Sequence, residues 1–486
     1  MAKTEFTVAI ELSSSRITGI AGTREPNGTI TVRAFAEEDA SRFVKKGVTL
    51  NINEAAKAMG SIVDSLEKQL SHKIAKVYLS ISGQTVRTVK NEIRRTVDNG
   101  DIVTEDLINE INDENRNYPI VDACILDVIP QEYDIDNTLV IEPIGVAGHN
   151  VKATLLNVVA RSYVKNNLTF SAEQAQLTLA DDLIVGPKAL AEAVLTETEK
   201  RSGCALVDFG ASTTTVAVYK NNLLRYLSVL PLGSENITRD LTALRIEEDE
   251  ARHLKEEYGD ALGEGTGEAP SGFPIKEWET FNDLITARTE EIIKNVWNQI
   301  LQSGYASKLF AGIVLTGGGS NLHNMEEAFR KYSSQSNIKT VKSPNCNVVG
   351  SLAATRQDAT LNTVYGMLQL GNENCCAEEE EPKPTPAVNS DAVARTASSA
   401  DNNLFADDEE YKRQEEETLR QNEEKERQRK ERERKEAEAK AERERENKKR
   451  ERRNIFKDLG RKMNKLSRDL FDDNSSKMDD DNSEKM

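Results

Sequence analysis

The sequence offers no obvious means of crossing a membrane. It contains no run of about 20 apolar residues, and its first residues, Met-Ala-Lys-Thr-Glu, lack the apolar core of a signal peptide. We therefore expect a protein that is made and kept in the cytoplasm. Any membrane contact is expected to be peripheral.

Features typical of disulfide-linked, zinc-binding and nucleic-acid-binding proteins are also missing. No two of the five cysteines have the C-x-x-C spacing, which favours a reducing compartment and excludes a disulfide framework. The adjacent Cys375 and Cys376 open the tail of the chain and are interpreted as incidental. The four histidines are too scattered to predict a metal cluster or a nucleophilic triad. The formal net charge of −18 argues against general affinity for nucleic acid.

Aromatic residues make up 5% of the chain and almost vanish beyond Gly371. Residues 372–408 contain Pro, Ser, Ala and acidic residues without an apolar period, which predicts a disordered linker. Residues 409–453 are nearly all Glu, Lys, Arg, Gln and Ala. They predict a solvated charged helix of roughly 65–70 Å, because only Tyr411 and Leu419 could serve a coiled-coil seam. An acidic stretch, 472–486, ends the chain.

Residues 454–471 carry an apolar stripe at helical spacing with basic residues on the remainder. This pattern is typical of a helix that lies in the membrane interface. A groove on a partner protein is the alternative, and docking on the protein's own core is disfavoured because the linker and the charged helix intervene. The candidate membrane-binding residues are Ile455, Phe456, Leu459, Met463, Leu466, Leu470, Lys462 and Lys465.

The first 371 residues contain one pattern twice. A strand, a short turn and two further strands occur at 6–35 and again at 205–231, and helices follow each copy. A helix over 54–70 is expected to be capped by Asn53, and helical sequence is expected from Ser171. The repetition predicts a duplicated α/β fold with a cleft between the halves, interrupted by a small α+β insert of about 80 residues.

Three turns of small residues follow predicted strands: Ser13-Ser14-Ser15, Gly210-Ala211-Ser212-Thr213 and Gly317-Gly318-Gly319. Small residues let backbone N–H groups approach phosphate. Glu11 and Asp208 precede the first two turns, and carboxylates there can hold hydrated Mg²⁺ against a triphosphate and act in catalysis by positioning the attacking water. Any one turn could be an ordinary hairpin, but three in a duplicated frame indicate a nucleotide site.

The motifs around these turns, 8–17, 207–214 and 313–320, resemble the phosphate and adenosine motifs of the actin/Hsp70/sugar-kinase superfamily. Within the superfamily, Tyr-Leu-Ser-Ile-Ser-Gly at 78–83 and Val-Ile-Pro-Gln-Glu-Tyr at 128–133 are similar to the extra subdomain of the FtsA family. The resemblance implies an actin-like (ribonuclease-H-like) first subdomain at 1–80 and 160–195, an insert at 81–159, and a second half at 196–371 with a helical subdomain at about 235–310.

The resemblance also implies the ligands and partners. ATP and Mg²⁺ would be held by Glu11, Asp208, Arg16, Lys255 and the three turns, with slow turnover that serves as a switch. Ser13 and Ser212 stand where the family usually has glycine, and Arg252 stands where it usually has glutamate. The family implies polymerisation with copies of itself, binding to the tubulin-like protein FtsZ and to later division proteins, and location on the cytoplasmic face of the inner membrane at the septum. The alternatives are a small-molecule kinase and a pilus-assembly scaffold on the same fold.

Overall fold

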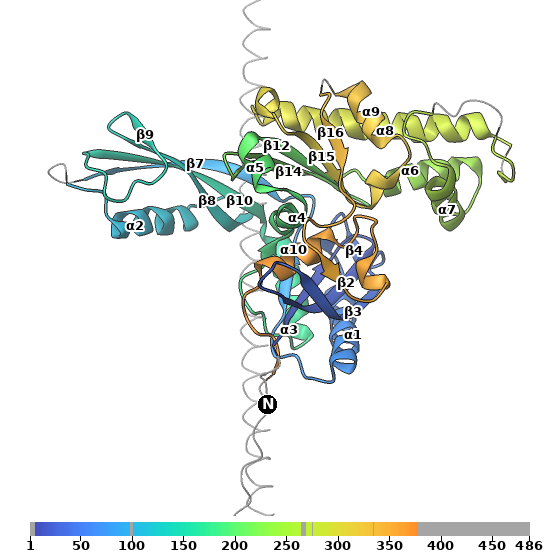
Figure 1. Cartoon of the computed structure of the whole chain (residues 1–486), viewed down its shortest axis with the longest axis horizontal. Helices are drawn as coiled ribbons and strands as arrows, with labels where there is room; N and C mark the ends of the chain where they lie inside the picture. The colour runs from blue at the N-terminus through green and yellow to red at the C-terminus, as the bar shows by residue number, and fades with distance from the viewer. Residues whose placement is uncertain (1–4, 98–100, 264–268, 275, 334, 378–486) are drawn as a thin grey trace, which may run out of the picture. The chain divides into compact units, whose positions relative to one another are not determined.

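The computed structural model describes residues 5–97, 101–263, 269–274, 276–333 and 335–377. Its first sheet has the strand order β11-β6-β1-β2-β3-β17, and Figure 1 labels two of these strands, β2 and β3. The strand β1 pairs antiparallel with β2 and parallel with β6, so β1 lies at the centre of the sheet. The strands are β1 (Thr7–Leu12), β2 (Arg16–Arg24), β3 (Ile30–Asp39), β6 (Tyr78–Ile81), β11 (Ile184–Val185) and β17 (Val348–Val349).

The helices α1 (Ile52–Leu70), α4 (Gly186–Val194) and α10 (Asn362–Leu370) pack on this sheet, and α3 (Ser162–Gln174) packs against α1. The apolar residues of α1 recur at helical spacing, and Met59, Ile62 and Leu66 are fully buried. The helices α4 and α10 approach one another closely, since a Cβ on Gly366 would lie 1.8 Å from the carbonyl oxygen of Ala189. Only glycine permits this crossing.

The second sheet repeats the topology of the first. Its strands run in the order β14-β13-β12-β15-β16, with the same antiparallel and parallel pairings as β3-β2-β1-β6-β11. The predicted duplicated fold is therefore confirmed. The strands are β12 (Cys204–Phe209), β13 (Thr214–Lys220), β14 (Leu223–Leu230), β15 (Gly312–Thr316) and β16 (Ile338–Thr340), and the helices are α5 (Glu197–Ser202), α6 (Ser234–Leu241), α7 (Glu248–Tyr258), α8 (Trp278–Gln302) and α9 (Met325–Tyr332).

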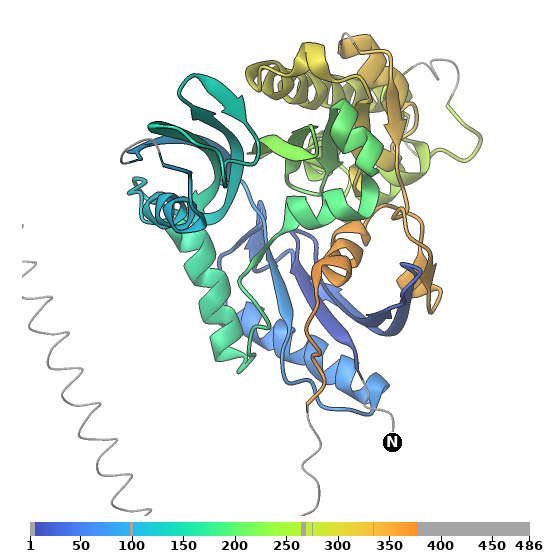
Figure 2. The same cartoon turned by 60° about the vertical axis from the view of Figure 1, so that its left-hand side comes forward.

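The predicted insert is an antiparallel sheet with α2 lying along it (Figure 1). Although it interrupts the first half in sequence, its strand β7 continues the second sheet by pairing with β14. The hydroxyl of Thr88 accepts a hydrogen bond from the backbone N–H of Leu227 at 2.9 Å, which reinforces this junction. Figure 2 turns the insert toward the viewer. Its elements are β7 (Arg87–Thr96), α2 (Glu105–Arg116), β8 (Ala123–Ile135), β9 (Thr138–Val140) and β10 (Asn150–Arg161).

Two expectations about helix starts were wrong. The cap of α1 is Asn51, whose side chain accepts a hydrogen bond from the backbone N–H of Glu54 at 3.2 Å, while Asn53 accepts one from Gln174. The helix α3 begins at Ser162, not near Ser171. Its helical period is weak in the sequence, because the exposed Tyr163 and Phe170 obscure the buried stripe of Val164 and Leu168.

The boundary of the linker also needs correction. Residues 372–377 belong to the folded core, because Cys375 is fully buried and exchanges backbone hydrogen bonds with Phe6 and Ala75. Cys376 forms a bridge with Ile74. Composition alone placed these residues in the tail, because their pairing partners lie about 300 or more positions earlier. The rest of the linker, the charged helix, the amphipathic segment and the acidic end lie outside the described residues.

Candidate functional site

The candidate site is built on two equivalent hairpins, β1–β2 and β12–β13. Each hairpin has a four-residue loop, 13–16 or 210–213, flanked by the last strand pairs Leu12–Ile17 and Phe209–Thr214. In each loop the first backbone N–H donates to the last carbonyl at 2.9 Å. A carboxylate stands two residues before each loop, as Glu11 in one hairpin and Asp208 in the other. Each half therefore contributes one hairpin loop with a carboxylate two residues before it.

The hairpins face one cleft of about 550 Å³. The first half contributes residues of β1, the 13–16 loop and β2, and the second half contributes residues of the 210–213 loop, α6, α7 and the triple glycine. The structure thus brings together most of the residues singled out in the sequence. The predicted residues that line the cleft are Glu11, Ser13, Ser15, Arg16, Asp208, Gly210, Ala211, Lys255, Gly317, Gly318 and Gly319.

The two carboxylates in the cleft are held where negative charge is disfavoured. Burial, followed by repulsion from Asp208, raises the pKa of Glu11 from 4.5 to about 8, although Thr363 and Arg16 oppose the rise. Burial raises the pKa of Asp208 from 3.8 to about 7. A cation between these groups would relieve both effects. The pair therefore suits a divalent cation that keeps much of its water shell.

The triple glycine closes against the second carboxylate. Gly317 has φ +84°, and a Cβ at this position would lie 2.2 Å from Oδ1 of Asp208 and 2.6 Å from the carbonyl oxygen of Phe209. Both the conformation and the close approach require glycine. A short 3₁₀ helix, Gly318–Asn321, follows and forms part of the cleft wall.

Ser14, Ser212 and Thr213 are not among the residues that line the cleft. The hydroxyl of Ser14 accepts a hydrogen bond from the backbone N–H of Gly47 at 2.8 Å, and that of Ser212 accepts one from Lys46 at 3.1 Å. Lys46 and Gly47 form the turn between β4 (Val44–Lys45) and β5 (Val48–Thr49). Both candidate phosphate loops therefore hold one turn of the first half, and Ser212 reaches it from the second half.

The hydroxyl of Ser13, the residue that replaces the family's glycine, donates to the carbonyl of Arg16 at 3.0 Å within its own loop. The amine of Lys255 lies beside α6, where it donates to the hydroxyl of Thr238 at 2.9 Å and to the carbonyl of Ser234 at 3.3 Å. Burial lowers its pKa to about 8. An anion nearby would favour the charged amine.

Sequence reasoning missed one wall of the cleft. Asp358, Ala359 and Thr360 line it from the loop before α10. Asp358 accepts hydrogen bonds from the backbone and the hydroxyl of Thr360 at 3.0 and 2.6 Å, so an Asp-x-Thr turn was the available signal. Other lining residues that the sequence did not single out include Glu235, Glu256, Asn321 and Thr363.

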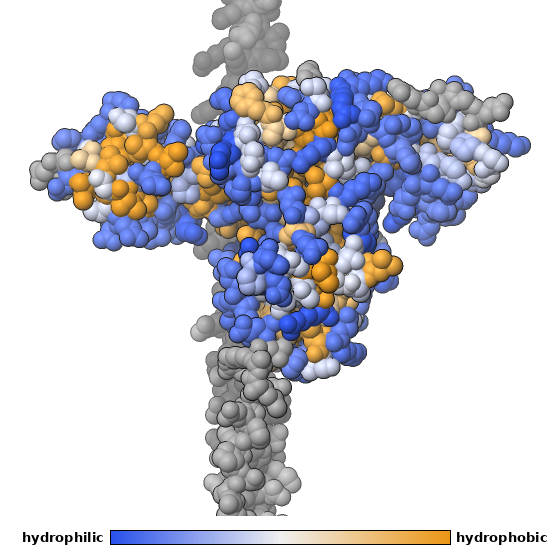
Figure 3. Space-filling view, in the orientation of Figure 1, coloured by the Kyte–Doolittle hydropathy of each residue, from blue (hydrophilic) through white to orange (hydrophobic). Residues whose placement is uncertain are grey.

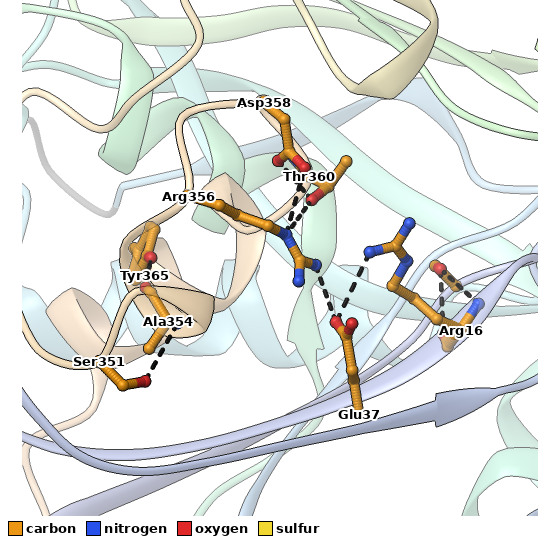
Figure 4. Close-up of polar contacts among 9 residues, drawn as sticks. Arg16, Glu37, Ser351, Ala354, Arg356, Asp358, Thr360 and Tyr365 are labelled. Atoms are coloured by element: carbon orange, nitrogen blue, oxygen red, sulfur yellow. Dashed lines mark hydrogen bonds and ion pairs between the residues drawn. The ribbon is translucent and has the colours of Figure 1, made fainter. Parts of the chain in front are cut away.

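A series of ion pairs joins this wall to β2 and β3 (Figure 4). Arg356 contacts Glu37 at 2.8 Å and Asp358 at 3.2 Å, and Arg16 reaches the same oxygen of Glu37 at 3.5 Å. Burial works against the charge of Glu37, but Arg356 and then Arg16 lower its pKa below the ordinary value. These ion pairs therefore connect β2, β3 and the 356–360 loop.

The described residues contain no helix long and apolar enough to cross a bilayer. Within the same part of the chain, no group of three or more His, Cys, Asp and Glu side chains could hold a metal ion. The candidate membrane-binding residues, Ile455, Phe456, Leu459, Lys462, Met463, Lys465, Leu466 and Leu470, lie outside the described residues.

Comparison with known proteins places the chain in a family. Residues 205–359 match the family described as cell division protein FtsA, and 83–159 match the SHS2 domain inserted in FtsA. The FtsA of Porphyromonas gingivalis is 31% identical over 66% of this chain and 70% of its own length. The FtsA of Escherichia coli K12 is 28% identical over 78% of this chain and 93% of its own length.

A solved PilM–PilN type IV pilus biogenesis complex is similar over 75% of this chain and 98% of its own, with a TM-score of 0.53 and 15% identity, which shows a common fold alone. The repeated sheets, the shared cleft and the SHS2 insert define an actin-like protein. The chain belongs to the FtsA family of cell division proteins.

Proposed function

We propose that the cleft binds ATP with Mg²⁺ and that the bound nucleotide controls assembly of the protein into filaments. The observation that carries this proposal is the convergence of two equivalent hairpin loops and a glycine turn around Glu11 and Asp208. The backbone of loops 13–16 and 210–213 would hold phosphates, and Gly317–Gly319 with Lys255 would hold the adenosine side. Magnesium, when bound, supplies charge neutralisation for the phosphates.

The chain's own groups fit this role. Glu11 and Asp208 offer acceptor oxygens to the water shell of a cation, and their mutual repulsion favours its binding. Lys255 offers a positive charge from a buried position. Ser13, Ser212 and Arg252 stand where the family usually has glycine or glutamate, so we expect slow turnover suited to a switch.

We further propose that the protein tethers FtsZ filaments to the cytoplasmic face of the inner membrane at the septum and helps recruit later division proteins. Membership of the FtsA family supports this role. The segment 454–471 would supply the membrane contact through its apolar stripe and basic residues. A single copy would bind weakly, and a filament would bind tightly because many copies act together.

Flotation with anionic vesicles tests the tether. The full chain with ATP should float and carry purified FtsZ with it, and a protein ending at Arg453 should bind FtsZ but stay at the bottom of the gradient. Equal flotation of both proteins would remove 454–471 as the anchor. Sugar-dependent ATP turnover would instead favour the kinase alternative, which shares the fold but gives no reason for the tail.

A further inference from the structure

The first turn of α10 contacts both halves of the molecule. The helix itself packs on the first half, against β1, β2 and α4. Its residue Thr363 lines the cleft, and the hydroxyl of Thr363 donates a hydrogen bond to the carboxylate of Glu11 on β1. The preceding residue, Asn362, donates from Nδ2 to the hydroxyl of Thr316 on β15 of the second half at 3.0 Å. Adjacent residues of one helical turn therefore hold one strand from each half.

The contact between α10 and β15 is buried. Figure 3 shows hydrophilic residues over much of the visible surface, which is where polar side chains ordinarily lie. Asn362 and Thr316, in contrast, are 1% and 0% exposed. The hydroxyl of Thr316 also donates to the carbonyl of Val341 at 2.9 Å. Because a buried amide that lost its partner would stay unsatisfied, the contact fixes the start of α10 against β15.

Thr316 lies directly beside the second carboxylate. It pairs with Asp208 in the parallel register of β12 and β15. The next residue is Gly317, where a Cβ would lie 2.2 Å from Oδ1 of Asp208. The first turn of α10 therefore touches one carboxylate of the cleft directly and holds the backbone that packs against the other.

The loop before α10 is also attached to the second half. Nδ2 of Asn321 donates to the carbonyl of Asp358 at 2.8 Å. The backbone N–H of Ala359 donates to the carbonyl of Lys342 at 2.9 Å. Asn321 and Lys342 both belong to the second half, so the chain enters α10 from a segment that is already fixed there.

We propose that Thr363 and Asn362 are positioning residues of the nucleotide site, and that the first turn of α10 sets the spacing of Glu11 and Asp208. Each residue acts through a carboxylate rather than on the nucleotide itself. Because Mg²⁺ demands near-ideal octahedral geometry, its water shell fits two carboxylates only within a narrow range of separations. The inference rests on the proposed binding of ATP with Mg²⁺ and names residues that prepare the site for it.

Calorimetric titration of ATP into the full chain, with and without Mg²⁺, tests the role of Thr363. Thr363→Val keeps the shape of the side chain but removes the hydroxyl, and should lower the Mg²⁺-dependent part of the ATP affinity about three- to tenfold. Thr363→Ser should restore it. Thr169→Val is the matched control, because Thr169 is a half-buried threonine of α3, outside the cleft, whose hydroxyl donates to the carbonyl of Lys165 at 3.0 Å.

Two results for Thr363→Val would overturn the proposal. One is a gain of affinity from Mg²⁺ equal to that of the unmodified chain. The other is an equal loss of ATP affinity with and without Mg²⁺, since that loss would mean that the hydroxyl only supports the local structure.

The role of Asn362 is tested by the same titration. Asn362→Leu nearly keeps the size of the side chain but removes the donor, and it should lower the Mg²⁺-dependent affinity. Thr316→Val removes the same hydrogen bond from β15 and should give a similar loss. Asn157→Leu is the matched control, because Asn157 is a fully buried asparagine of the insert, outside the cleft, that donates to Asn115 at 3.1 Å. A gain from Mg²⁺ that is unchanged in both variants would exclude the role of Asn362.

Unfolding of the ligand-free chain in urea gives a readout that needs no nucleotide. The losses of unfolding free energy in Thr363→Val and Glu11→Ala should be less than additive in the double variant, because both remove the same hydrogen bond. Full additivity would refute the contact of α10 with Glu11. An unmodified chain that gains no ATP affinity from Mg²⁺ would instead refute the proposed function, so the two failures differ in their readout.

Discussion

Glu11 and Asp208 occupy equivalent positions in the two halves of the molecule and repel one another across the cleft that they share. Each lies on the first strand of its hairpin, two residues before a loop closed by the same backbone hydrogen bond. The duplication thus places two carboxyl groups in one cleft. We regard this arrangement as the physical basis of a magnesium–nucleotide site.

Replacement of Gly317 by alanine should be far more damaging than its backbone angle alone implies. A Cβ there meets Oδ1 of Asp208 at 2.2 Å, whereas Gly28 has nearly the same φ, +83°, with nothing within 4 Å. Gly28→Ala should therefore cost about 1 kcal/mol of unfolding free energy, and Gly317→Ala about 2–4 kcal/mol. Urea unfolding measures both, and equal losses would contradict the close approach.

The carboxylate pair should make the ligand-free protein less stable as the pH rises. The folded-state pKa values of Glu11 and Asp208 are raised to about 8 and about 7, so the folded protein keeps protons that the unfolded chain releases above about pH 4. This stability is fully present at low pH and is lost as the pH rises through 7–8.

The double variant Glu11→Gln, Asp208→Asn removes these two titrations. Between pH 5 and pH 8 the unfolding free energy of the unmodified protein should fall by about 1–3 kcal/mol more than that of the double variant. A shift of one pKa unit corresponds to at most about 1.36 kcal/mol. We expect only a fraction of this value, because the cleft admits water. Chemical unfolding across this range gives both slopes. Identical slopes would show that the two groups titrate normally.

The hydroxyls of Ser14 and Ser212 should each slow hydrogen exchange at one backbone amide, Ser14 at Gly47 and Ser212 at Lys46. Ser212→Ala should speed hydrogen exchange at Lys46, and Ser14→Ala should speed it at Gly47, because each variant removes one acceptor worth about 0.5–1.5 kcal/mol. Exchange followed by NMR distinguishes the two sites, and each variant is the control for the other. Unchanged exchange at Lys46 in Ser212→Ala would exclude this contact between the two halves.

Arg356 should stabilise the wall of the cleft that contains Asp358. Arg356→Ala removes its contacts with Glu37 and Asp358, and we expect nucleotide affinity to fall about three- to tenfold. Arg24→Ala is a suitable control, since Arg24 donates to the carbonyl of Gln369 at an exposed site. Combination of Arg356→Ala with Glu37→Gln should be less than additive. If the losses of affinity were fully additive, the ion pairs in Figure 4 would not act as a unit.

The sequence predicted the duplicated fold because both halves carry the same local pattern, and the cleft followed from carboxylates and small residues at equivalent strand ends. It did not predict features that depend on distant pairing. The burial of Cys375 against Phe6 and the attachment of β7 to β14 join segments that no local period connects. The wall at 358–360 was missed because its turn has no strand of its own before it.

Calorimetric titration of ATP tests the central claim most directly, with and without Mg²⁺, on the unmodified protein, Asp208→Asn and Asp64→Asn. Asp64 lies exposed on α1, outside the cleft. The unmodified protein and Asp64→Asn should bind ATP more tightly with Mg²⁺, and Asp208→Asn should lose at least about tenfold of that Mg²⁺-dependent affinity. An ATP affinity of the unmodified protein that is the same with and without Mg²⁺ would contradict the account. So would an Asp208→Asn protein that binds ATP with Mg²⁺ as tightly as Asp64→Asn does.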